Sequence, residues 1–510
     1  MTAFFNRSGI FLFPAISSIA FYLTILYEIP VAGFLFLIPL IYTLSENSAS
    51  LRRLLTANTV YTGLLYLIIL GWAPGVMEAY TGGNSALTYL CYAAFVLIAL
   101  VISNLLIWLY YLAVKGARRT GSFSLPLLAF TLFLQEAAMS TLLPGMPWLT
   151  LHLAYSVIHQ DYVLQWASIG GVYFISFCIA NFNVLLFIIF RYAHKRLVTV
   201  PLYLVFLVAG LLFGYYRLEK DNDPGTGDHG LKIAVITENV PATTRWDAAS
   251  VNSLVDTYFS LCRQALATQP DLVVWTESAV PWTYSGEDDF LDSLIRISRP
   301  YKVSHIIGMN TAAGPESVYN SAYFIRDGRV AGRQDKIYLL SFAEKPLFSF
   351  SLPFLQTEGF SAENGEDIHL FSLQDHRIGA LICNESNVSG AALDMADAGA
   401  DLLINISNDS WFSNSGLLMN MHFKNARLRA VESGRPVIVN SNQGYCGYIS
   451  GKGQVQDRHR HTSAHLATYS VHKKIYNTFY LDNKKLLILL LTLHPVTLYL
   501  LTRKKRPIHE

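Results

Sequence analysis

Long apolar runs dominate the first 218 residues, and polar residues there are mostly confined to the short segments between the runs. A helix that crosses a bilayer needs about 20 predominantly apolar residues. Seven such runs precede residue 218 and an eighth lies near the C-terminus, at roughly 8–26, 29–45, 57–76, 86–114, 123–143, 161–191, 199–217 and 484–502. The pattern predicts a membrane domain of seven transmembrane helices over residues 1–218, with an eighth transmembrane helix and a basic tail over residues 483–510.

Between residues 219 and 482 the pattern changes to short apolar runs that alternate with amphipathic segments. Strand-like runs include "LKIAVITEN", "PDLVVWTES", "RIGALIC" and "DLLINISND". Residues 248–267 instead place apolar side chains such as Val251, Leu254 and Val255 at helical spacing. Because strands that alternate with helices form sheets covered by helices, we expect this stretch to be a separate α/β domain.

The positive charges are distributed unevenly among the loops. Lys and Arg residues mark the cytoplasmic side of a membrane protein. They follow the second, fourth, sixth and eighth runs, at Arg52, Arg53, Lys115, Arg118, Arg119, Arg191, Lys195, Arg196, Arg503, Lys504, Lys505 and Arg506. The alternate loops, around 77–85 and 144–160, contain no Lys or Arg. We therefore expect both termini in the cytoplasm and the α/β domain on the opposite side of the membrane.

The composition agrees with a membrane protein and excludes two other classes. Hydrophobic residues make up 52% of the chain and charged residues only 15%, against about 25% charged residues in typical soluble proteins. The net charge of +2 and the lack of a long basic run argue against nucleic-acid binding. The five cysteines show no C-x-x-C or zinc spacing, and such an odd, sparse set is not a disulfide framework. They are Cys91, Cys178, Cys262, Cys383 and Cys446.

Three reactive side chains lie at or just after predicted strands of the α/β domain. Glu277 ends one apolar run, Lys336 follows a predicted hairpin, and Cys383 ends another apolar run. A thiol that acts as a nucleophile needs a base and benefits from a nearby cation. Spacing alone does not show that the three side chains meet. A cysteine after a buried strand is also typical of an inert, buried small residue.

Several segments around these residues resemble motifs of a known superfamily. "VVWTESAVPW", "QDKIYLLSFAE", "ALICNE" and "LLINISNDSWF" resemble the motifs of the nitrilase, or carbon–nitrogen hydrolase, superfamily. With the eight apolar runs, the chain resembles the apolipoprotein N-acyltransferase family of bacterial membrane enzymes. "NVPATTRWD", "YNS", "MHFKNARLRAVESGRPVIVNSNQG" and "GGVYFISFCIANFN" fit the same family. The resemblance implies a multi-span α-helical membrane domain and a periplasmic, nitrilase-like α-β-β-α sandwich over residues 219–482.

The resemblance also implies roles for individual residues. Glu277 would be the general base, Lys336 the group that stabilises the oxyanion, and Cys383 the nucleophile. Glu344, Glu385 and Trp246 would support the site; a surface carboxylate or a packed indole is the alternative for each of them. Three positions depart from the usual pattern of the family, and they bear on the shape of the pocket rather than on the chemistry: Asn384, Ala343 and Lys345.

The implied activity is acyl transfer between lipids. An acyl chain would pass from a membrane phospholipid to the α-amino group of the N-terminal S-diacylglyceryl-cysteine of apolipoproteins, in a ping-pong scheme through a thioester on Cys383. The partners would be the phospholipid, the diacylated apolipoprotein and the inner-membrane bilayer, with no nucleic acid. We expect a monomer without cofactor or metal.

Two other functions compete with acyl transfer. One is a membrane-anchored amidase that uses the same three residues and water, and the other is an inactive scaffold or lipid-binding protein. Seven spans weigh against a simple anchored amidase, since one span would suffice as an anchor. The intact set of Glu277, Lys336 and Cys383 weighs against an inactive scaffold.

Two apolar stretches of the α/β domain are expected to admit lipid, at residues 339–354 and 411–423. An exposed apolar loop on a soluble domain is a liability unless it meets membrane or substrate. The alternative is that both loops pack on the core. The side chains expected to contact lipid are Phe342, Phe348, Phe350, Trp411, Phe412 and Leu418.

Two further groups of polar residues leave alternatives open. Gln135 and Glu136 are either substrate contacts at membrane depth or loop residues just outside the bilayer. His459, His461 and His465 lie in "DRHRHTSAH". A metal site is conceivable there, but no carboxylate or cysteine pattern completes it, so a solvated loop is the favoured interpretation.

Overall fold

The chain folds into two compact units. The computed structural model describes residues 2–116, 124–219, 230–242, 244, 248–284, 286–315, 317–341, 343–345, 361–412 and 415–502. The first unit, here the helical unit, comprises residues 1–77, 84–219 and 482–510. The second, here the α/β unit, comprises residues 78–83 and 220–481.

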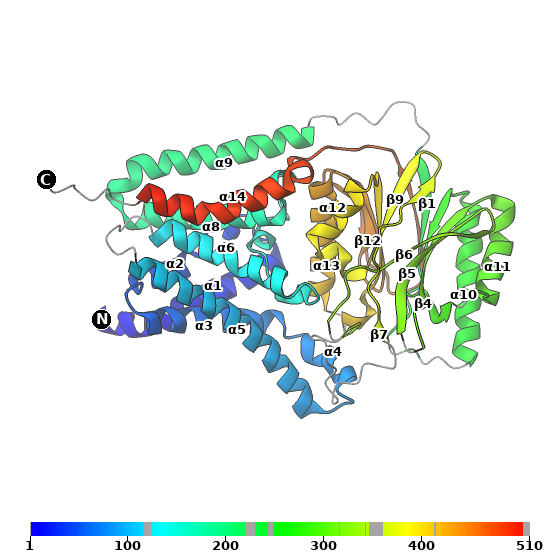
Figure 1. Ribbon diagram of the computed structural model, residues 1–510, viewed down its shortest axis with the longest axis horizontal. Coiled ribbons are helices and arrows are strands. Elements are labelled where there is room, and N and C mark those ends of the chain that lie inside the picture. Colours follow the sequence, from blue (N-terminus) through cyan, green and yellow to red (C-terminus); the bar gives the residue numbers. More distant parts are fainter. Residues whose placement is uncertain are drawn as a thin grey trace. The chain divides into compact units, whose positions relative to one another are not determined.

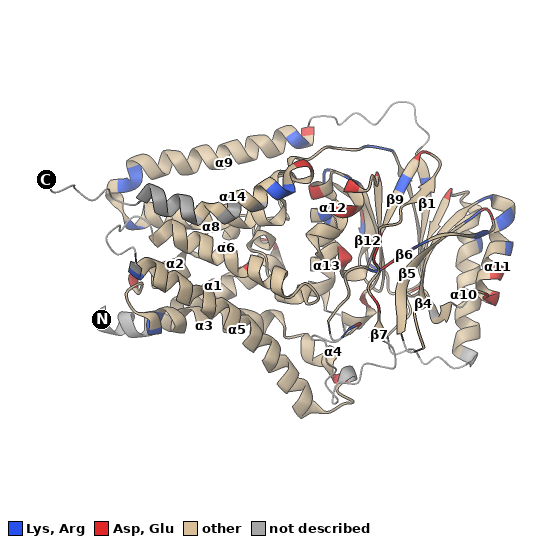
Figure 2. Ribbon diagram, in the orientation of Figure 1, with Lys and Arg blue, Asp and Glu red and all other residues tan. Residues whose placement is uncertain are grey.

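The helical unit has a helix at each of the predicted apolar runs (Figure 1). These helices are α1 (Thr2–Tyr27), α2 (Ile38–Glu46), α3 (Leu51–Ile69), α5 (Ser85–Gly116), α6 (Ser124–Leu142), α8 (Ala167–Arg191), α9 (Arg196–Glu219) and α14 (Phe479–Thr502), with short helices α4 (Ala73–Tyr80) and α7 (Asp161–Leu164). Figure 2 shows how few charged residues interrupt α5, α6 and α8.

Among the described residues, five helical segments are long and apolar enough to cross a membrane. They are Gly9–Tyr27, Ser85–Lys115, Ser124–Leu142, Ala167–Arg191 and Ala193–Glu219. Helix α2 has only nine residues, and α3 begins with the basic pair Arg52 and Arg53. Eight membrane crossings therefore remain a prediction from the sequence.

Helix α8 is broken near its beginning by two glycines. Gly170 has φ −158° and ψ 27°, and Gly171 has φ 69° and ψ −168°. Glycine adopts such positive φ values without the steric cost that a Cβ atom brings. The break lies in the longest predicted run, residues 161–191, and the short helix α7 precedes it.

The α/β unit contains two sheets. Its strands are β1 (Leu231–Thr237), β2 (Leu272–Val274), β3 (Val280–Tyr284), β4 (Ser304–Ala312), β5 (Ser317–Arg326), β6 (Arg329–Asp335), β7 (Ser361–Ala362), β8 (Phe371–Leu373), β9 (His376–Ile382), β10 (Leu402–Asn408), β11 (Val437–Asn442), β12 (Cys446–Ile449), β13 (Val455–His459) and β14 (His465–Val471). Among the described residues, the first sheet has eight strands, in the order β14-β1-β2-β4-β5-β6 with β3 and β7 beside β4 and β5. The second has six, in the order β13-β12-β11-β10-β9-β8.

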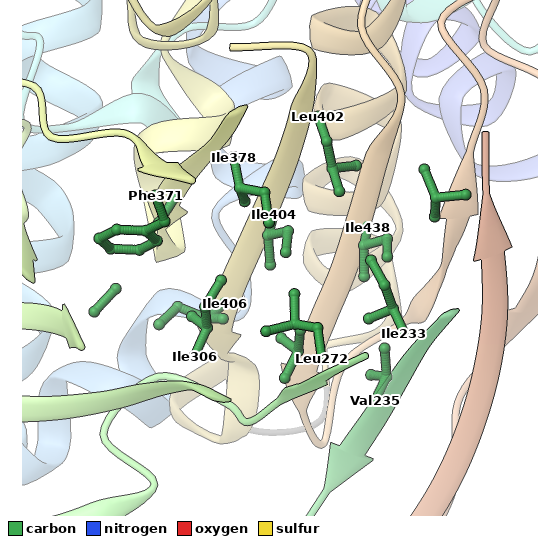
Figure 3. Packing of buried hydrophobic residues seen from close by; sticks show 14 of the residues in the cluster. Ile233, Val235, Leu272, Ile306, Phe371, Ile378, Leu402, Ile404, Ile406 and Ile438 are labelled. Atoms are coloured by element: carbon green, nitrogen blue, oxygen red, sulfur yellow. The ribbon is translucent and has the colours of Figure 1, made fainter. Parts of the chain in front are cut away.

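The two sheets face each other across an apolar core. Side chains from both sheets form this core, as Figure 3 shows for Ile233, Leu272, Ile378, Ile404 and Ile438. Each fully buried aliphatic side chain of this kind contributes about 1.5–3 kcal/mol to stability. Each sheet also has a second, outer apolar face. Because a helix must cover that face, strands alternate with helices along the chain.

Helices cover the outer face of each sheet. Helices α10 (Ala248–Ala267) and α11 (Asp289–Ser298) pack on the first sheet through a cluster that includes Tyr258, Leu261 and Leu294. Helices α12 (Ser389–Asp397) and α13 (Gly416–Ser433) pack on the second sheet. The predicted α-β-β-α sandwich is confirmed, and the helix predicted over residues 248–267 has those bounds.

In both sheets, reactive side chains lie at or just after the carboxyl ends of parallel strands. Strands β1, β2 and β4 are parallel in the first sheet, and β9, β10 and β11 are parallel in the second. Glu277 follows β2, Cys383 follows β9, and Asn408 ends β10. Side chains from strand ends of two different sheets can therefore meet.

Candidate active site

Glu277, Lys336 and Glu344 form one buried cluster. Lys336 Nζ lies 2.7 Å from Glu344 Oε1 and 3.4 Å from Glu277 Oε1. Asn320 Nδ2 donates to the same two oxygens, at 2.8 Å to Glu277 and 3.1 Å to Glu344. Lys336 is only 1% exposed. Burial by itself would lower the pKa of Lys336, but the charges of Glu344 and Glu277 outweigh it and raise that pKa above its ordinary value.

Glu277 joins the two sheets. It follows β2 of the first sheet, and its Oε2 accepts a hydrogen bond from the backbone N–H of Asn408 at 2.9 Å. Asn408 ends β10 of the second sheet. The carboxylate therefore has three donors that hold it in one orientation, and these come from Asn320, Lys336 and Asn408.

Cys383 occupies a strained backbone position at the end of β9. Its φ is 54°, in the left-handed region that a residue with a Cβ atom adopts at a cost of about 1–3 kcal/mol. It begins the 3₁₀ helix Cys383–Asn387 and is 7% exposed. Burial and the charge of Glu277 raise the pKa of the Cys383 thiol well above its ordinary value, although Lys336 acts in the opposite direction. The resting thiol is therefore protonated, and its reaction requires a base.

Glu385 ties the turn at Cys383 to the segment after Lys336. Its Oε2 accepts from the N–H of Ile382 at 2.8 Å, and its Oε1 accepts from the N–H groups of Ile337 at 2.8 Å and Tyr338 at 3.1 Å. Burial raises the pKa of Glu385 to about 7, even though these backbone donors favour the charged form. Asn384 adds a second link, since its Nδ2 donates to Tyr338 O at 3.0 Å.

A histidine and an aspartate that the sequence did not single out also contact this turn. His422 Nε2 lies 3.0 Å from Cys383 O, and His422 Nδ1 lies 2.9 Å from Asp409 Oδ1. A carbonyl and a carboxylate are both acceptors, so both imidazole nitrogens must donate and the ring is cationic. Burial opposes this charge, but Asp409 outweighs it and raises the pKa of His422. The imidazolium thus holds the carbonyl of the strained residue.

The other predicted site residues have different outcomes. Trp246, Phe342, Phe348 and Phe350 lie outside the described residues. Trp411 is 45% exposed, whereas Phe412 and Leu418 are half-buried. Much of the predicted loop over residues 411–423 is the beginning of α13, where Met419, Met421 and Phe423 are buried. Of these three side chains, Phe423 belongs to the apolar cluster that packs α13 against the second sheet.

Sequence reasoning missed Asn320, Asn408, Asp409 and His422. Asn320 lies on β5 next to Lys336, whose backbone N–H donates to Asn320 O at 2.8 Å. The signal for Asn408 and Asp409 was their position at the end of a predicted strand, the same signal that singled out Glu277 and Cys383. His422 gave no such signal, because it lies inside a helix.

Comparison with known proteins shows the family to which the chain belongs. A family model described as "Carbon-nitrogen hydrolase" matches residues 232–472, and one described as "Apolipoprotein N-acyltransferase N-terminal domain" matches residues 8–185. An apolipoprotein N-acyltransferase of Geobacter metallireducens is 32% identical over 364 residues, which cover 68% of this chain and 68% of that protein. The chain belongs to the apolipoprotein N-acyltransferase family. It is therefore an acyltransferase of the nitrilase superfamily that acts in lipoprotein N-acylation.

Further relatives extend the similarity along the chain. Apolipoprotein N-acyltransferases of Aquifex aeolicus and Pseudomonas syringae pv. tomato are 29% and 26% identical, over 72% and 81% of this chain and 80% and 81% of those proteins. Among solved structures, an amidase from Nesterenkonia sp. is similar over 51% of this chain and 97% of its own, with 14% identity and a TM-score of 0.38. Family membership and the five long apolar helices found among the described residues together identify a protein of the bacterial inner membrane.

Proposed function

We propose that this enzyme moves an acyl chain from a membrane phospholipid to the α-amino group of the N-terminal S-diacylglyceryl-cysteine of apolipoproteins, through a thioester on Cys383. One observation carries the proposal. A protonated, strained thiol at the end of β9 shares a buried site with the ion-paired cluster of Glu277, Lys336 and Glu344. This set contains a nucleophile, a base and a fixed positive charge.

In the first half-reaction, Cys383 Sγ attacks the ester carbonyl of the phospholipid while Glu277 takes the thiol proton. Proton transfer must accompany attack, because a free thiolate beside Glu277 is disfavoured. Lys336 stabilises the negative charge that develops on the carbonyl oxygen. The C–O bond then breaks, and the lysophospholipid leaves with the proton returned by Glu277.

In the second half-reaction, the α-amino group of the acceptor attacks the thioester. Glu277 accepts a proton from that amine, the amide bond forms, and the C–S bond breaks. The sulfur regains a proton and the resting thiol is restored. Glu344 supports both steps, because its bonds to Lys336 Nζ and to the N–H of Leu340 hold the ammonium in place.

We also infer that the α/β unit, residues 219–482, faces the periplasm, with residues 1–218 and 483–510 forming eight crossings and both termini in the cytoplasm. The charge asymmetry of the loops supports this. Cysteines introduced at two exposed positions test it. Gln264→Cys, on α10, should react with an impermeant thiol reagent in intact spheroplasts, whereas Lys115→Cys should react only after lysis. The reverse pattern would exclude this topology.

Lipid substrates require contact between the α/β unit and a lipid surface. The exposed indole of Trp411, in the 3₁₀ turn Asp409–Phe412 that follows β10, supports a lipid-contact role for this part of the unit. We propose that Trp411, Phe412 and Leu418 contact the acyl chains, and that Phe342, Phe348 and Phe350 do the same.

Mass spectrometry of the full-length enzyme incubated with phospholipid alone tests the proposed mechanism. We expect one acyl adduct, labile to hydroxylamine, on the peptide that contains Cys383. Cys383→Ala should form no adduct and transfer no acyl chain, and Cys262→Ala is the matched control because it removes another buried cysteine of the same unit. Rapid release of fatty acid without a lasting adduct would favour the amidase-like alternative. Full transfer activity in Cys383→Ala would exclude the thioester.

A further inference from the structure

Three histidines converge where the chain passes from one sheet to the other. His459 is the last residue of β13, His461 lies in the connecting loop, and His465 is the first residue of β14. Strand β13 is an edge strand of the six-stranded sheet, and β14 is an edge strand of the eight-stranded sheet. The sequence favoured a solvated loop here, because no carboxylate or cysteine pattern completes a metal site. The local sequence does not reveal that His459 and His465 lie on two different sheets.

The imidazole rings are close enough to share one ligand. One ring nitrogen from each histidine lies within 4.8 Å of the other two. The ring centroids of His461 and His465 are 3.5 Å apart, and those of His459 and His461 are 4.5 Å apart. Metal–nitrogen bonds of about 2.0–2.1 Å in a tetrahedral site bring ligand atoms to about 3.3 Å from one another, so rotation of the stacked rings is the adjustment required.

His459 is already oriented as a metal ligand. Its Nδ1 donates to the backbone carbonyl of Asp457 at 2.8 Å, which leaves the lone pair on Nε2. Within the described part of the chain, this Nε2 is buried and has no hydrogen-bond partner. A metal-bound histidine usually donates a hydrogen bond from its other ring nitrogen, and this bond fixes the tautomer of the ring. The Asp457 carboxylate, 3.5 Å from the same Nδ1, adds negative charge behind the ring.

The cluster lies beside a contact between the two sheets. His465 pairs with Thr237 on β1, and His459 pairs with Cys446 on β12. Thr237 Oγ1 and Cys446 Sγ are 3.4 Å apart, and Thr237 also donates to Asn440 of β11 at 2.9 Å. A ligand held by His459 and His465 would therefore link the two edge strands next to a point where the sheets already touch.

We propose that His459, His461 and His465 bind one divalent cation of the zinc class, which clamps the two sheets of the α/β unit together at this edge. Three imidazole ligands suit Zn²⁺ and similar divalent transition-metal ions better than Mg²⁺ or Ca²⁺, which prefer oxygen ligands. The fourth position would take water. The role is structural, so the cation takes no part in acyl transfer.

Zinc binding to the full-length protein in detergent, after EDTA treatment and removal of the chelator, tests the proposal. We expect one Zn²⁺ per chain by elemental analysis after gel filtration, and a higher melting temperature with Zn²⁺ than with Mg²⁺. His461→Ala removes a ligand from a loop, so it should leave the fold intact while weakening Zn²⁺ binding at least about tenfold. His472→Ala is the matched control, because His472 is exposed on the same unit outside the cluster.

The outcomes separate the alternatives without a measurement of acyl transfer. Co²⁺ in place of Zn²⁺ should give the intense visible absorption of a tetrahedral site in wild type and in His472→Ala, and lose it in His461→Ala. Equal Zn²⁺ binding by the two variants would overturn the proposal, as would a melting temperature that does not respond to Zn²⁺ in the wild type. A solvated histidine loop predicts both of these negative results.

Discussion

Each unit buries a glutamate that is bonded to a basic side chain, but the two glutamates have different surroundings. In the helical unit, Glu136 Oε1 lies 3.1 Å from His152 Nδ1, and Oε2 accepts from the N–H of Leu153 at 2.7 Å. In the α/β unit, Glu277 accepts from Lys336, Asn320 and the N–H of Asn408. Both carboxylates are about 95% buried, so burial alone does not distinguish them.

The difference lies in what stands beside each carboxylate. Glu136 holds the backbone and the imidazole of one short segment, and it shares a small cavity with Tyr61 and Tyr66. Glu277 is paired with a buried ammonium, and both charges act on a thiol whose backbone is strained. A buried ion pair is weak evidence for function by itself. An adjacent nucleophile held in an unfavourable conformation is what turns such a pair into a candidate for catalysis.

Among changes to the two glutamates and the groups around them, Glu277→Gln should have the largest effect. Glutamine keeps the size of the side chain but cannot take the thiol proton, so acyl-enzyme formation should fall by about 10²–10⁴-fold. Stopped reactions with phospholipid, analysed by mass spectrometry of the Cys383 peptide, measure this. Asp256→Asn, on the exposed part of α10, is the control. Near-normal acylation in Glu277→Gln would mean that Glu277, like Glu136, has only a structural role.

Lys336→Met should have the next largest effect on rate. It keeps much of the apolar stem but removes the charge, and the loss of one oxyanion-stabilising group costs about 10²–10³ in rate. It also leaves Glu277 and Glu344 without their buried cation, which should lower the free energy of unfolding by about 3–5 kcal/mol. Acylation rates on folded protein and urea unfolding of the same sample separate the two effects. Lys302→Met, at the surface, should change neither.

His422→Gln should slow acylation by up to about 10²-fold, because a displaced Cys383 backbone misaligns the sulfur. The effect should depend on pH. Asp409 raises the pKa of His422, so its cationic contribution is complete below about pH 6.5 and is lost as the pH rises through the raised value. The ratio of wild-type to variant rates should therefore be largest at low pH and shrink at high pH. A ratio that is constant with pH would mean that His422 acts only through packing.

Glu136→Gln should have the smallest effect on chemistry. An amide can still accept one of the two hydrogen bonds, so we expect an unchanged rate of acyl-enzyme formation and a loss of about 1–3 kcal/mol in stability. Thermal unfolding in detergent and the acylation assay measure the two quantities. A large loss of acylation with unchanged stability would contradict the structural role and would give the helical unit a part in the reaction.

The sequence by itself determined the layout of the chain and the identity of its reactive side chains. Apolar runs of bilayer length and strands alternating with amphipathic helices are local patterns, since each element's own burial sets its periodicity. Glu277, Lys336 and Cys383 could be singled out because they end or follow predicted strands. Their roles came from the resemblance to a known family, because spacing along the chain does not show which strand ends meet.

Only the tertiary structure decided which groups meet. Sheet order and the stacking of two sheets bring Asn408 of β10 to Glu277 after β2, and β13 to β14 at the histidine cluster. His422 lies inside a helix, where the sequence pattern gives a histidine no special signal. Its ring reaches the carbonyl of Cys383 only because α13 packs on the second sheet. Such contacts depend on pairings between segments far apart in sequence, and a local hydrophobic pattern records that a side chain is buried but not what it is buried against.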